Sequence, residues 1–116
     1  MIEEKTFKVA RGFTVQVSLR HVPDQPSWLG GPFKWEAKPI YGKKKVMPVG
    51  YNISQSGLSD NIADVKLSIA SSTMSWFAKT IGKTPRQIKH DKRFTTFLND
   101  FMEWVDEVEN DFGGVV

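Results

Sequence analysis

The spacing of apolar residues changes halfway along this 116-residue chain, and the change limits the folds that it can adopt. In the first half, polar residues alternate with the apolar residues Phe13, Val15, Val17 and Leu19. A strict period of two is typical of a strand with one buried face. In the second half, apolar residues recur at helical spacing. Strands followed by helices predict an α+β fold, with the helices packed on an antiparallel sheet.

About four strands are predicted between residues 4 and 53, as two hairpins. The first hairpin turns at Gly12, just before the alternating segment. The second turns at residues 41–44, and its return strand is expected at residues 46–53. Pro39 cannot donate a ladder hydrogen bond, so we expect its strand to lie at an edge of the sheet or to carry a bulge.

Two or three helices are predicted after the strands. Residues 64–70 fit both a strand and a helix, and we favour a helix opened by Ser59 or Asp60. From residue 72 the helical spacing is clear, and Gly82 stands where a helix commonly ends in the left-handed conformation.

Signals for a new helix follow immediately. Thr84, Pro85 and Gln87 form the capping-box arrangement, with proline at the first helical position. From Phe94 to Val108, apolar residues form a stripe at helical spacing. We expect this last helix to pack across the sheet. Residues 1–112 are predicted to form a single domain and residues 113–116 a flexible tail.

The charge of the chain reverses at Arg93. From Lys83 to Arg93 five bases stand against one acid, Asp91, whereas six acids and no base follow. One continuous helix would carry these charges against its own macrodipole, since a helix N-terminus is partly positive and its C-terminus partly negative. Either the helix breaks near Asp91 or each charged block meets a partner.

The segment 76–88 resembles the core of a helix-turn-helix. Ala78, Gly82 and Ile88 hold the matching positions for the close contact, the turn and the apolar residue that packs back. The resemblance implies that the second helix enters the major groove of DNA by its N-terminal residues. One departure is Asp91, where the motif usually has an apolar residue. An ordinary corner between two helices fits the same residues.

The first functional hypothesis is a small non-enzymatic regulator that binds DNA or RNA. Arginine suits guanine and glutamine suits adenine, while each neutralised phosphate makes binding more sensitive to salt. The three lysines of the second hairpin turn are auxiliary phosphate contacts, or serve solubility alone. The predicted contacts are Lys43, Lys44, Lys45, Lys83, Arg86, Gln87, Lys89, Lys92 and Arg93.

The alternative is a protein-binding adaptor or inhibitor, such as a small protein of a phage or other mobile element, whose partner has a basic surface. The acids of the last helix dock on that surface, or are only its solvated face. A tryptophan in the loop rich in Gly and Pro presents an anchor, or tucks back to seal the sheet. The predicted contacts are Trp28, Leu29, Asp100, Glu103, Asp106 and Glu107. A homodimer is compatible with either function.

The sequence contains few residues or motifs that would indicate an enzyme. The chain has no cysteine and two histidines, His21 and His90, and it lacks a glycine-rich phosphate loop and a nucleophile elbow. We therefore expect no enzyme activity, metal or cofactor. Its first residues lack the basic and apolar regions of a secretory signal, and no apolar run reaches about 20 residues, so we expect a cytoplasmic protein without a membrane partner.

Overall fold

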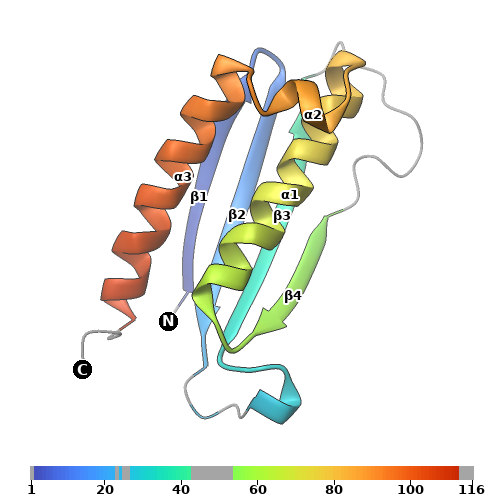
Figure 1. The fold of residues 1–116 in the computed structure, drawn as a ribbon. Helices are drawn as coiled ribbons and strands as arrows, with labels where there is room; N and C mark the ends of the chain where they lie inside the picture. The colour runs from blue at the N-terminus through green and yellow to red at the C-terminus, as the bar shows by residue number, and fades with distance from the viewer. Residues whose placement is uncertain (1, 23, 25–26, 43–53, 113–116) are drawn as a thin grey trace.

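Within the part of the chain that the structure defines, four strands form one antiparallel sheet and three helices follow them (Figure 1). The structure is a computed structural model, which describes residues 2–22, 24, 27–42 and 54–112. The elements are β1 (Ile2–Ala10), β2 (Phe13–His21), the 3-10 turn η1 (Ser27–Leu29), β3 (Phe33–Tyr41), β4 (Gln55–Ser59), α1 (Ile62–Ile81), α2 (Pro85–Ile88) and α3 (Lys92–Asp111). The strands lie in the order β1-β2-β3-β4, which confirms the predicted α+β fold.

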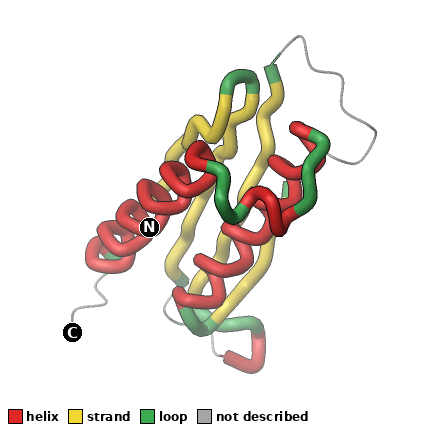
Figure 2. The backbone as a smooth tube through the Cα atoms, turned by 45° about the horizontal axis from the view of Figure 1, so that its top comes forward, coloured by secondary structure: helices red, strands yellow, loops and turns green. Residues whose placement is uncertain are grey.

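One face of the sheet is covered by helices. The alternating residues of β2 that were predicted to be buried are buried: Phe13, Val15, Val17 and Leu19. Phe7 pairs with Val15 and Ala37 pairs with Val17, so this apolar face continues across β1, β2 and β3. Both α1 and α3 lie on it, and no helix of the described residues covers the opposite face (Figures 1 and 2).

The fourth strand lies later in the sequence than predicted. The strand expected at residues 46–53 falls outside the described residues, whereas β4 begins at Gln55. It pairs with Phe33–Ala37 of β3 and stops before Pro39. β3 is an inner strand, but among the described residues no strand pairs with Pro39 on the side where β4 lies. Proline has no N–H to donate, so it is tolerated where one side of the strand is unpaired.

The ambiguous segment 64–70 is helical and belongs to the 20-residue helix α1. The helix is capped by the side chain of Asn61, one residue after the predicted cap at Asp60 and two after Ser59. Its apolar residues at helical spacing face the sheet, and this burial decides the choice between helix and strand. The predicted end is confirmed, because Gly82 adopts the left-handed conformation with φ of 68°.

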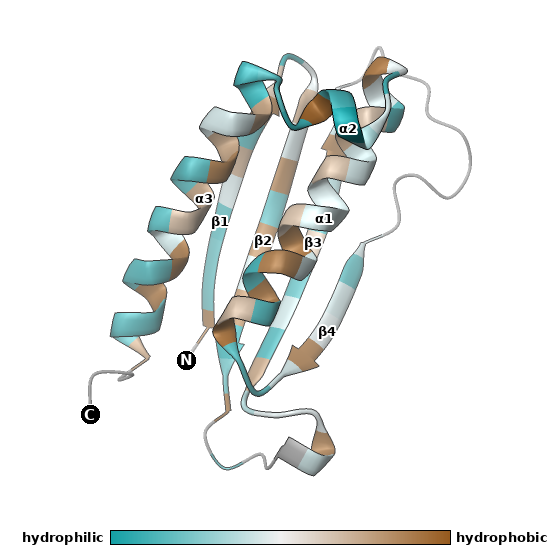
Figure 3. Ribbon diagram, viewed as in Figure 1, coloured by the Kyte–Doolittle hydropathy of each residue, from teal (hydrophilic) through white to brown (hydrophobic). Residues whose placement is uncertain are grey.

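An aromatic cluster holds α3 on the edge strand β1. The ring of Phe7 meets those of Phe97, Phe101 and Trp104 edge to face, with centroids 5.6, 5.8 and 5.6 Å away. All four side chains are buried, and such contacts add to the stabilisation from burial alone. The predicted packing of the last helix on the sheet is confirmed, while the outer side of α3 is hydrophilic (Figure 3).

Truncation of Phe7 should remove the central member of this cluster. We expect Phe7→Ala to lower the free energy of unfolding by about 3–5 kcal/mol, since it leaves a cavity between β1 and α3. Urea denaturation measures the change. The control is Lys8→Ala, an exposed neighbour on β1 that should alter stability by less than about 0.5 kcal/mol. Equal effects of the two substitutions would contradict the role of the cluster.

Candidate functional site

The described basic residues of the predicted nucleic-acid site lie at one end of the molecule, where α2 joins α1 to α3 (Figure 2). We call this surface the basic end; it consists of Lys83, Arg86, Lys89, Lys92 and Arg93. All five residues are exposed. Among the described residues, Arg93 alone of the five forms an ion pair. The three predicted auxiliary contacts, Lys43, Lys44 and Lys45, lie outside the described residues.

The corner that presents the basic end is built from the predicted cap. The backbone N–H of Gln87 donates to the hydroxyl of Thr84 at 3.4 Å, and the backbone N–H of Thr84 donates to the side-chain oxygen of Gln87 at 3.0 Å. The capping box is thus confirmed. Ile88 is fully buried and anchors the corner to the core, as the sequence predicted. The exposed bases therefore project from a fixed backbone.

The second helix of the corner is shorter than a recognition helix. It comprises four residues, because α2 ends at Ile88 and Asp91 caps the start of α3. A helix of one turn cannot lie along a major groove as the second helix of a helix-turn-helix does. The amide oxygen of Gln87 is already engaged in the capping box, so this side chain is not available for two hydrogen bonds to adenine. The geometry matches the plain corner.

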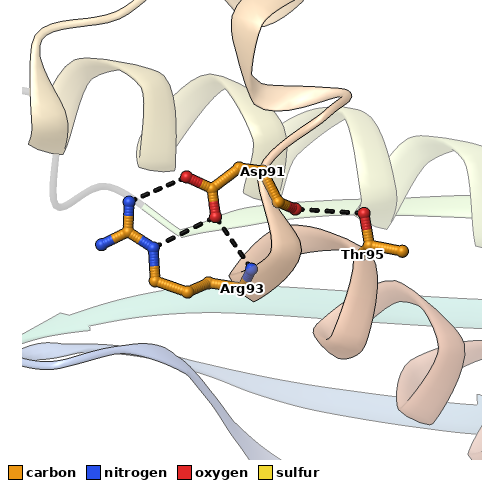
Figure 4. Close-up of polar contacts among 3 residues, drawn as sticks. All are labelled: Asp91, Arg93 and Thr95. Carbon is orange, nitrogen blue, oxygen red and sulfur yellow. Dashed lines mark hydrogen bonds and ion pairs between the residues drawn. The ribbon is translucent and has the colours of Figure 1, made fainter.

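Asp91 lies within the basic end, where it caps the start of α3 and fixes Arg93 (Figure 4). The carboxylate accepts hydrogen bonds from Nε and Nη2 of Arg93 at 3.1 and 2.8 Å, and from its backbone N–H at 2.8 Å. The guanidinium also lies 5.0 Å from the centre of the Phe77 ring. These hydrogen bonds lower the pKa of Asp91 to about 2. Arg93 is consequently the least available cation of the basic end.

The charges of α3 oppose its macrodipole even after the helix break. Lys92 and Arg93 occupy its first turn without an acid, and its last turn carries no base. Each such charge is unfavourable by about 0.3–1 kcal/mol when exposed at low salt. Asp91 offsets part of this effect at the N-terminus. Local helix stability therefore does not explain the positions of these charges.

The acids of α3 project from two sides of the helix. Asp106 forms an ion pair of 2.6 Å with Lys66 of α1. In contrast, Asp100, Glu103 and Glu107 line the side toward β1. The four acids predicted to bind a protein thus do not form one surface.

The loop residues predicted to bind a protein are separate from the acids. Trp28 lies in η1 and is 82% exposed, so it does not tuck back to seal the sheet. Leu29 beside it is 52% exposed. The structure places both in the connection between β2 and β3.

A groove of about 380 Å³ between β1 and α3 is not evident from the sequence. Its aromatic floor is formed by Phe7, Phe97 and Trp104. Residues 5–8 form one wall and the inward-turned acids of α3 form the other. We call it the edge groove. The sequence of α3 shows its apolar stripe and the acids beside it, but it does not show which strand the helix covers.

Comparison with known proteins found no matching family model, no matching curated protein and no matching solved structure. Among the described residues, no group of three or more His, Asp or Glu side chains could hold a metal ion. In the same part of the chain, no helix has the length and apolar character needed to cross a membrane.

The ion pair at Asp91 predicts a specific dependence of stability on pH. Because its folded pKa is about 2 and its ordinary value is 3.8, its contribution is present above about pH 4 and is lost as the pH falls toward 2. Asp91→Asn keeps a good N-cap but cannot titrate. Urea denaturation should show a smaller loss of stability in this variant than in the wild type over that interval. Equal losses would contradict the assignment.

Proposed function

We propose that the protein binds the phosphate backbone of a nucleic acid through the basic end. The observation that carries the proposal is the exposure of Lys83, Arg86, Lys89 and Lys92 without an ion pair in the described structure. Cations that neutralise phosphates release counterions, and this release supplies much of the affinity for nucleic acids. The four residues lie in the short segment 83–92, between the end of α1 and the first turn of α3, and we propose that one stretch of phosphate backbone contacts them together.

The distribution of charge along α3 gives further support. Its first turn carries Lys92 and Arg93, where cations are locally unfavourable, and an external anion would compensate them. Its acids begin at Asp100, about two turns further along the helix. A nucleic acid that approaches the basic end with α3 pointing away avoids these carboxylates. Such a dipolar distribution also orients a charged partner before contact.

The mode of binding that we propose is recognition of the backbone and not of base sequence. The single turn of α2 offers no long surface to a groove, and Gln87 is held in its capping box. Phosphate contacts position a protein without reading sequence. The same chemistry applies to DNA and RNA.

Loss of two lysines from the basic end should weaken binding in a manner that depends on salt. Duplex DNA should retard the wild-type protein at about 50 mM salt. Lys89→Ala combined with Lys92→Ala should reduce the slope of log affinity against log salt by about 2, since two phosphate contacts are lost. The matched control is Lys34→Ala with Lys38→Ala, which removes two exposed lysines from β3. No retardation of the wild type at low salt, or equal losses in both variants, would refute the proposal.

Removal of the one acid at the basic end should have the opposite effect. Asp91→Asn frees Arg93 from its ion pair while keeping the cap of α3. We expect tighter DNA binding and a salt slope larger by about 1, because one more cation becomes available. Gel retardation over a series of salt concentrations measures both. An unchanged slope would show that Arg93 does not contact the backbone.

A further inference from the structure

The edge groove contains an unpaired strand edge. β1 pairs with β2 on one side, and no strand of the described residues pairs with its other side. Consecutive side chains of a strand point to opposite faces, yet residues 5–8 all line the groove. Four consecutive residues can line the same groove only if the groove runs along the backbone edge of β1. The N–H and C=O groups of alternate residues are therefore directed into it.

The groove has an aromatic floor and, on the α3 side, a wall of negative charge. Phe7, Phe97 and Trp104 form the floor. Above it stand Asp100, Glu103 and Glu107, which are spaced by three and four residues and so lie on one side of α3. All three are exposed, and none is in an ion pair among the described residues. On the β1 side the ammonium of Lys5 lies 5.3 Å from the centre of the Phe7 ring.

We propose that the edge groove binds an extended cationic peptide, which adds to the sheet as a further strand beside β1. Main-chain hydrogen bonds to the free edge would hold the peptide, as in other cases of strand addition. Every second side chain would point between β1 and α3. There, the aliphatic stem of an arginine or lysine can pack on the small exposed part of the aromatic floor while its charged head reaches the carboxylates. The intervening side chains would extend the uncovered face of the sheet.

The charges of the groove favour a cationic peptide over a nucleic acid or a second copy of this chain. A nucleic acid is disfavoured, because the three carboxylates of the groove repel phosphate and outnumber its two lysines, Lys5 and Lys8. A second copy of this chain could pair through β1, but antiparallel pairing of two such edges would bring their α3 helices together with Asp100, Glu103 and Glu107 facing the same acids. β1 also carries charges along its length, a common protection against pairing between copies. A cationic peptide would be attracted by these carboxylates and would bring no second α3 helix with it.

The first test uses a synthetic peptide with blocked ends, alternating Arg and Thr over about nine residues, the length of β1. Isothermal titration calorimetry should detect binding, and the same peptide with Glu in place of Arg should not bind. Glu103→Gln with Glu107→Gln should weaken binding about fivefold. The matched control, Asp106→Asn with Glu109→Gln, removes two charges outside the groove and should change little. No binding, or equal weakening by both pairs, would overturn the proposal.

The second test distinguishes strand addition from attraction of charge alone. N-methylation of single peptide bonds removes one donor at a time, so binding should fall at every second position and persist at the positions between. Uniform tolerance would overturn the proposal. So would sedimentation analysis that finds the free protein dimeric, together with protection of the β1 edge amides from hydrogen exchange, because the edge would then be occupied. Lys89→Ala with Lys92→Ala should leave peptide binding intact, so this test succeeds or fails independently of nucleic-acid binding.

Discussion

The contact between Phe7 and the aromatic residues of α3 determines where this helix lies on the sheet and what its polar sides face. Because Phe7 belongs to the edge strand β1, the helix lies over the margin of the sheet and not over its centre. This position separates the acids of α3 into two sets. Asp106 turns toward Lys66 of α1, whereas Glu103 and its neighbours along the helix line the edge groove. One hydrophobic interaction thus fixes both the position of the helix and the use of its polar sides.

The break at Asp91 explains how the chain accommodates a reversal of charge that one helix would oppose. The basic block is divided among the corner, α2 and the first turn of α3. Asp91 caps the new helix and holds Arg93, so one of the two N-terminal cations has a local partner. The remaining bases gain no such stabilisation from the described structure. Local helix stability therefore does not account for their placement, which the proposed binding of a phosphate backbone would use.

Much of the fold could be predicted because its signals are local. The alternation in β2, the apolar stripe of α3, the glycine at the end of α1 and the capping box at Thr84 each depend on a few neighbouring residues. β4 gave no such signal, since its sequence has little β propensity. It becomes a strand through a non-local contact, in which Gly57 pairs with Trp35 and lies directly against the indole. Although β4 is an edge strand, its pairing with β3 and its packing beside α1 compensate for weak intrinsic preference.

The candidate sites follow the same division between local and non-local information. The basic end is one continuous segment, so its residues could be identified from the sequence, although the short length of α2 and the engagement of Gln87 could not. The edge groove joins residues about 90 positions apart, and it exists only because β1 is an edge and α3 lies over it. Acids at regular helical spacing usually indicate only the solvated face of a helix. A free strand edge beside them adds directional hydrogen bonds, and this combination distinguishes the groove from the other charged surface of α3.

The two proposed ligands have opposite charges and would attract each other in solution. Binding them at separate surfaces of one small protein therefore requires that the surfaces be kept apart. α3 meets this requirement, since its first turn belongs to the basic end and its carboxylates begin about two turns later. Both interactions are screened by salt, but the groove also offers backbone hydrogen bonds, which depend less on ionic strength. Binding of a peptide should thus persist at salt concentrations that release a nucleic acid held mainly by its phosphates.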